Sequence, residues 1–212
     1  MKIKTLEVAG IGPAIHAMRN PYDSWDKSDT VHGRVGTKDK ELSERLANAG
    51  PEHCKHLRMC QVWAEITAPR YWWTQFDTYR HGVEKVSCST MHRLTARPLT
   101  LDDFEETPTG KRSHALDELI KYLNELMDGY NTKTDDRKLQ CWSYLIQMLP
   151  QSYLQRRTVM VSYAALRSMY NQRKGHKLKQ WQQFRDWCET LPESWMITGW
   201  TPEPTGDDGD AD

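Results

Sequence analysis

Hydroxyl and cationic side chains are concentrated between residues 80 and 93 of this chain. The segment begins with Arg80-His81-Gly82 and continues with further polar donors: Ser87, Ser89, Thr90, His92 and Arg93. Such donors form strong hydrogen bonds to the oxygens of an anion, and a nucleotide phosphate presents several of these oxygens. The segment is therefore a candidate phosphate-binding site. The end of a helix followed by an ordinary polar loop would have the same composition.

The residues ahead of this segment predict a helix that begins at Pro69, because proline is favoured in a first helical turn. The apolar residues that follow recur at the spacing of one helical face: Trp72, Phe76 and Tyr79. Arg80–Gly82 would then close the helix, since cations are favoured in a last turn and glycine is a common stop.

Two further groups of residues could do chemistry. His53, Cys54 and His56 precede the next predicted strand, but their spacing matches no familiar zinc pattern, so we predict that no metal is bound there. Cys88 is a candidate nucleophile, because cations such as those around it can activate a thiol.

Charge and cysteine content exclude several function classes. Lys+Arg and Asp+Glu are both 29, so no basic surface predicts direct nucleic-acid binding. Five cysteines, with no CxxC pair and no signal peptide ahead of them, indicate free thiols in a reducing cytoplasm. No apolar run is long enough to span a bilayer, so no membrane partner is expected. Nine tryptophans and nine tyrosines suit a core, a planar ligand or a subunit interface.

The pattern of the whole chain predicts an α/β fold with a central mixed sheet flanked by helices. Strands are expected near residues 1–9, 57–68 and 83–97, and the second of these alternates between two faces. Further helices are expected near residues 14–19, 38–49, 115–127, 139–149, 162–172 and 178–190. A single domain is expected over residues 1–200, followed by a disordered acidic tail over residues 201–212.

The cationic segment resembles the signature of the flavin-dependent thymidylate synthases, the ThyX family. That signature is Arg-His-Arg, seven residues and Ser, and this chain has Arg80-His81-Gly82, the seven residues 83–89 and Thr90. Leu149-Pro150 and, further on, Gln180-Trp181 resemble a second block of the family. The two blocks have the order and separation that they have in the family. The resemblance covers residues 40–190.

The resemblance implies two sets of binding residues. The flavin-binding set is His53, His56, Arg80, His81, Ser162 and Ser168, where either histidine fits the family's single position ahead of the strand. The nucleotide-binding set is Arg80, Ser87, Ser89, Thr90, His92, Arg93 and Arg173, with Arg173 placed against the pyrimidine ring.

Several family residues are replaced in this chain. Gly82 stands in place of the second motif arginine, Thr90 in place of the motif serine, and Ile146 in place of a phosphate-binding arginine. Ser162 and Ser168 stand in place of two asparagines that hold the flavin. A fold can persist through such changes while its site is altered.

The family's reaction is the reductive methylation of the pyrimidine deoxynucleotide dUMP, with FAD, NADPH and methylenetetrahydrofolate. The cofactors carry the difficult steps, so the resemblance implies an FAD-dependent methyltransferase that needs no catalytic side chain as nucleophile. It also implies a homotetramer with sites shared between subunits, in the cytoplasm, or in the host cytoplasm if a virus encodes it. Three hypotheses are open: such an enzyme acting on dUMP or dCMP, a catalytically inactive nucleotide-binding protein on the same scaffold, and a structural oligomerisation module.

Overall fold

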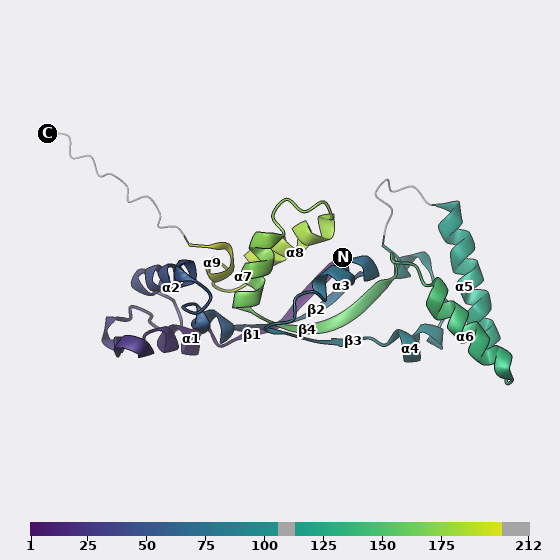
Figure 1. Cartoon of the computed structure of the whole chain (residues 1–212), viewed down its shortest axis with the longest axis horizontal. Coiled ribbons are helices and arrows are strands. Elements are labelled where there is room, and N and C mark those ends of the chain that lie inside the picture. Colours follow the sequence, from purple (N-terminus) through teal and green to yellow (C-terminus); the bar gives the residue numbers. More distant parts are fainter. Residues whose placement is uncertain (106–112, 201–212) are drawn as a thin grey trace. The chain divides into compact units, whose positions relative to one another are not determined.

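The computed structural model of the chain describes residues 1–105 and 113–200 (Figure 1). They form two compact units, each built from two separate parts of the sequence. Unit 1 contains residues 1–6 and 63–160, and unit 2 contains residues 7–62 and the described residues from 161 onward. The expected single domain stays a prediction, and the expected tail at 201–212 lies outside the described residues.

Four strands form one antiparallel sheet in the order β1-β2-β4-β3. The strands are β1 (Lys2–Ala9), β2 (Gln61–Pro69), β3 (Val83–Ser87) and β4 (Leu154–Ser162). Alternate side chains of β2 are buried, as the sequence pattern predicts: Val62, Ala64, Ile66 and Ala68. Helices flank the sheet, so the predicted α/β fold is confirmed, although its strands are antiparallel rather than mixed.

The helices of unit 1 are α3 (Arg70–Phe76), α4 (Thr90–Arg93), α5 (His114–Thr132) and α6 (Asp136–Met148), with the 3-10 turns η4 (Leu94–Ala96) and η5 (Leu101–Asp103). In Figure 1, α5 and α6 lie side by side as a hairpin. Their buried residues Leu123, Met127 and Leu145 belong to one apolar cluster with Phe104 and Leu149. α3 is instead anchored by its own aromatic face, where Trp72, Trp73 and Phe76 are buried against one another.

The helices of unit 2 are α1 (Ile11–Met18), α2 (Thr37–Ala49), α7 (Tyr163–Gln172), α8 (Lys179–Glu189) and α9 (Trp195–Thr198), with the 3-10 turns η1 (Asn20–Tyr22), η2 (Trp25–Lys27) and η3 (Lys55–Arg58). The helices predicted near residues 162–172 and 178–190 form α7 and α8, and each buries one apolar face: Leu166, Met169, Trp181, Phe184, Trp187 and Cys188. Every helix in the described parts of both units is too short or too polar to cross a bilayer.

The fourth strand, β4, is missing from the sequence prediction. Its first half, Gln155–Thr158, is polar and typical of a loop, whereas its second half buries Val159 and Val161. Polar side chains are tolerated in the first half because some of them form specific contacts inside unit 1.

Two predicted strands are shorter in the structure. The strand predicted from residue 57 begins at Gln61, because η3 buries His56 and Leu57 in a 3-10 turn. The strand predicted to reach residue 97 ends at Ser87. It stops there because the Ser89 hydroxyl accepts from the backbone N–H groups of the next helix and begins α4.

Candidate functional site

Arg80 and His81 lie in the turn between α3 and β3, and both side chains are exposed. The sequence predicts that they close α3, but the helix ends at Phe76. Gly82, at the end of the turn, has a φ of 68°, a left-handed conformation that glycine adopts at little cost. The turn therefore presents a guanidinium and an imidazole to solvent outside the helix.

Contacts at Asp77 and in the turn after it explain why α3 ends early. The Thr78 N–H donates to the Gln75 carbonyl at 3.2 Å, and the Tyr79 N–H donates to the Phe76 carbonyl at 3.0 Å. Asp77 is the C-cap residue, and its carboxylate accepts from cations on two strands. The helix thus ends in local turn hydrogen bonds, and residues distant in the sequence hold the side chain of its C-cap residue.

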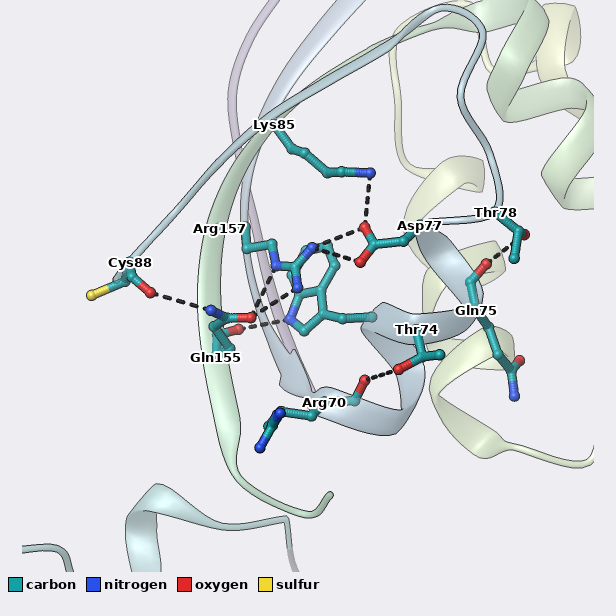
Figure 2. Close-up of polar contacts among 10 residues, drawn as sticks. Arg70, Thr74, Gln75, Asp77, Thr78, Lys85, Cys88, Gln155 and Arg157 are labelled. Carbon is teal, nitrogen blue, oxygen red and sulfur yellow. Dashed lines mark hydrogen bonds and ion pairs between the residues drawn. The ribbon is translucent and has the colours of Figure 1, made fainter. Parts of the chain in front are cut away.

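The Asp77 carboxylate is held by one arginine and one lysine (Figure 2). Arg157 Nη1, on β4, lies 2.9 Å and 3.1 Å from its two oxygens, and Lys85 Nζ, on β3, lies 2.7 Å from one of them. Burial raises the pKa of the Asp77 carboxyl, but the hydrogen bonds and charges of Lys85 and Arg157 outweigh this and hold the pKa below its usual value. The carboxylate is therefore ionised at neutral pH.

Arg157 is held on the sides that do not face Asp77. Its guanidinium carbon lies 4.3 Å from the centre of the Trp73 ring, a cation–π contact. Its Nε and Nη2 donate to Gln155 Oε1 at 3.1 Å and 2.8 Å (Figure 2). The Trp73 indole N–H donates to the Gln155 carbonyl at 2.8 Å. The Gln155 amide also donates to the Cys88 carbonyl at 3.3 Å. We call Trp73, Asp77, Lys85, Gln155 and Arg157 the Asp77 cluster.

The polar residues after β3 form a second exposed group. The Ser89 hydroxyl accepts from the Met91 N–H at 3.2 Å and from the His92 N–H at 3.3 Å, so it caps α4. The remaining predicted residues follow the backbone around this cap, with Thr90 partly exposed and the others exposed: Ser87, Thr90, His92 and Arg93.

The strand β3 separates these two groups. Arg80 and His81 precede it, whereas Ser89 and Thr90 follow it. A strand rises about 3.3 Å per residue, so the length of β3 places the two groups roughly 15 Å apart. The segment that looks like a single cluster in the sequence is therefore two clusters in the structure.

The two candidate histidines differ in exposure. His56 is 3% exposed, and its Nε2 lies 2.8 Å from the Ser43 hydroxyl. Burial, together with the charge of Arg167, lowers the pKa of His56 to about 4, so the ring is neutral at physiological pH. His53 is exposed, with its Nε2 3.5 Å from a Glu52 carboxylate oxygen.

The remaining predicted residues of unit 2 lie on α7 or at its end. Ser162 is 2% exposed, and its hydroxyl accepts from the Ala165 N–H at 3.2 Å, so it caps the helix. Ser168 is exposed on the same helix. Arg173 is the C-cap residue, and its guanidinium carbon lies 4.4 Å from the centre of the Trp181 ring. This contact restricts the orientation of a planar donor group.

Asp77, Lys85 and Arg157 are absent from the residues predicted by sequence. Arg157 follows Asp77 by 80 positions and reaches it through the strand that the sequence pattern misses. An available signal was the period-two pattern of Gln155, Arg157, Val159 and Val161, whose side chains are half-buried or buried. That pattern indicates a strand with one face turned inward.

Two solved structures with a similar fold are flavin-dependent thymidylate synthases. A flavin-dependent thymidylate synthase ThyX from Helicobacter pylori, complexed with FAD and dUMP, matches with a TM-score of 0.69 and 19% identity, over 93% of this chain and 98% of its own. A second Helicobacter pylori ThyX structure with FAD and dUMP matches with a TM-score of 0.68 and 18% identity, over the same shares. No protein-family model and no curated protein matches the sequence. The chain therefore has the fold of the flavin-dependent thymidylate synthases.

Proposed function

We propose that this chain is a flavin-dependent thymidylate synthase-like enzyme that methylates dUMP reductively, with FAD, NADPH and methylenetetrahydrofolate. The observation that carries the proposal is the fold match over 93% of the chain to proteins whose structures contain FAD and dUMP. The sequence motif at Arg80–Thr90 supports it independently, because it was identified without reference to the fold.

The donor groups in unit 1 suit anionic ligands. Arg80, His81, His92 and Arg93 are exposed cations or imidazoles, and a flavin dinucleotide and dUMP both carry phosphates. When bound, the reduced flavin supplies hydride and the folate supplies the one-carbon unit. The chain's residues would bind the phosphates, orient the two rings and stabilise negative charge that develops on the uracil.

His53 is the better of the two histidine candidates for the flavin. Its ring is exposed, whereas the His56 ring is buried against Ser43 and held neutral. Moving His56 to a ligand would break a buried hydrogen bond, which costs about 1–3 kcal/mol. We therefore assign His53 to the cofactor and His56 to the folding of η3.

The separation of the two polar groups supports a site shared between subunits. Arg80 and His81 lie at one end of β3 and Ser89 and Thr90 at the other, and a shared site would place such groups from different copies of the chain around one nucleotide. Arg173 of unit 2 is proposed to donate to the pyrimidine ring. The expected assembly is a homotetramer, and light scattering that finds a monomer at micromolar concentration would contradict this part of the proposal.

A catalytically inactive nucleotide-binding protein is the second candidate function. Ile146, which stands where the family has a phosphate-binding arginine, packs against the apolar cluster of α5 and α6. Its side chain contributes to the core, so one phosphate contact of the family has no replacement at that position. This loss favours weaker nucleotide or flavin binding on an unchanged fold.

Flavin content and nucleotide titration separate the two candidates. The purified protein is denatured and the supernatant scanned for flavin absorption, and stripped protein is titrated with FAD and then with dUMP and dCMP by calorimetry. We expect bound or rebound FAD, and dUMP affinity that rises with FAD present. His53→Ala should weaken FAD binding, whereas Lys55→Ala, an exposed neighbour, should not. Nucleotide binding without FAD would support the inactive protein, and binding of neither would overturn both proposals.

A further inference from the structure

The turn that carries Arg80 and His81 is attached to the rest of unit 1 through Asp77. This residue ends α3 and precedes Arg80 by three positions. Its carboxylate contacts Lys85 on the strand that follows the turn and Arg157 on the neighbouring strand. The start of the turn is thereby bonded to two strands of the sheet.

Arg157 is the more constrained of the two cations. Its side chain is 14% exposed, compared with 29% for Lys85. Its three nitrogens are engaged, Nη1 with Asp77 and the other two with Gln155 (Figure 2). The Trp73 ring lies against its guanidinium, with the guanidinium carbon 4.3 Å from the ring centre. Lysine is a flexible point charge, whereas this arginine offers a rigid planar contact with one orientation.

We propose that Arg157 is a positioning residue, which holds Asp77 and thereby fixes the turn that directs Arg80 and His81 toward the nucleotide and the flavin. This inference rests on the proposed function, because it assigns Arg157 a role at that same site. Trp73 and Gln155 extend the role, since they hold the guanidinium where its Nη1 contacts both carboxylate oxygens. Arg157 itself is not required to touch either ligand.

The same contacts join the turn to the segment on the far side of β3. Gln155 accepts from Arg157 through its side-chain oxygen and donates through its side-chain nitrogen to the Cys88 carbonyl. Cys88 precedes Ser89, the cap of α4. One arginine–glutamine pair on β4 therefore contacts Asp77, which precedes the turn, and Cys88, which precedes α4.

The test compares Arg157→Met with Arg156→Met. Methionine keeps much of the apolar stem over Trp73 and removes the guanidinium. Arg156, the preceding residue, is 59% exposed and has a long 3.8 Å contact with Glu65. Its replacement removes the same charge but leaves the Asp77 cluster intact. Arg157→Met should weaken binding of dUMP and FAD about tenfold, and Arg156→Met should change either by less than about twofold.

A double variant separates positioning from charge neutralisation. In Arg157→Met the Asp77 carboxylate loses its better partner, and adding Asp77→Asn removes that unbalanced charge. If Arg157 merely neutralises Asp77, the double variant should regain both melting temperature and ligand affinity. If Arg157 positions the turn, melting temperature should recover while ligand affinity stays about tenfold weak. Arg157→Lys should rescue binding only in part, because lysine cannot reproduce the planar contact.

Hydrogen exchange supplies a readout that needs no ligand. Amides of residues 78–82 should exchange faster in Arg157→Met than in the unsubstituted protein or in Arg156→Met. Unchanged exchange in this turn would overturn the inference whatever the ligands do. If the unsubstituted protein binds neither dUMP nor FAD, the proposed function fails while faster exchange still supports the structural link. If it binds both and Arg157→Met binds them equally well, the inference fails and the proposed function stands.

Discussion

Each unit of this chain contains an aspartate bonded to an arginine, and the two pairs differ in their access to solvent. In unit 2, Asp39 has no exposed surface and accepts from Arg19, from the Ser28 and Thr30 hydroxyls and from the Thr30 N–H. In unit 1, the Asp77 side chain is 39% exposed, and it is bonded to Lys85 and Arg157. The first carboxylate is saturated by its own unit, whereas the second borders a turn that faces solvent.

This difference indicates what each pair is for. A fully buried pair holds segments of the core in place, because either charge alone inside the protein is very unfavourable. Asp39 therefore joins α2 to the irregular segment 28–30 and to Arg19 after α1. A half-exposed pair contributes little to stability in water. The Asp77 pair is accordingly better placed to set the geometry of a neighbouring turn than to stabilise unit 1.

The largest expected effect is a difference in the free energy of unfolding between variants of the two aspartates. Asp39→Asn leaves Arg19 buried without a full counter-charge, so we expect a loss of about 3–5 kcal/mol in the free energy of unfolding. Asp77→Asn should cost about 1 kcal/mol or less, because water screens the pair. Urea denaturation of both variants measures the difference. Equal losses would mean that burial does not distinguish the two pairs.

A second effect concerns pH and the buried histidine of unit 2. The folded pKa of His56 is about 4, below its ordinary value of 6.5, so between these values the unfolded chain binds more protons than the folded one. The contribution of neutral His56 to the free energy of unfolding is therefore fully present above pH 6.5. It is lost as the pH drops toward 4, by about 3 kcal/mol in total. Urea midpoints measured between pH 4 and 8 check this slope.

The control for that titration is His56→Gln, which has no titrating ring and can keep a hydrogen bond to Ser43. Its stability should depend less on pH across the same window, although it starts lower at neutral pH. A steep slope that persists in the variant would assign the pH dependence to another group.

The smallest effect concerns binding by unit 2. If Arg173 donates to the pyrimidine, Arg173→Ala should cost about 1.5–3 kcal/mol of dUMP binding, roughly ten- to a hundredfold in affinity. Arg185→Ala is the matched control, since Arg185 also stacks on an aromatic ring of this unit, Tyr170, at 4.2 Å. Calorimetric titration should show a loss for Arg173→Ala alone. Similar affinities for the two variants would show that Arg173 does not bind the nucleotide. Thr90→Ala tests the polar residues after β3 in the same way.

Several elements were predictable because their signal is local. The apolar faces of α7 and α8 follow from helical spacing, and the buried face of β2 follows from alternation over 61–69. The cap at Ser162 also follows from its residue type and place. These features depend on neighbours within a few positions, which a single sequence displays directly.

The details of the candidate site were less predictable, because they depend on distant partners. The exposure of His53 and the burial of His56 are decided by the η3 turn and by Ser43 on α2, which no spacing within residues 53–56 indicates. The separation of Arg80 from Ser89 is decided by where β3 begins and ends.

The sequence by itself determined that the chain carries an Arg-His motif with following hydroxyls, a sheet with flanking helices and the aromatic faces of the core. The tertiary structure decided where α3 stops and which side chains hold its end. The physical reason is that helix periodicity reports only contacts three or four positions apart. Arg157, in contrast, contacts Asp77, the C-cap residue of α3, from 80 positions away. The proposed role of this ion pair, which is to hold the turn from which Arg80 and His81 extend, is therefore not visible in the motif itself.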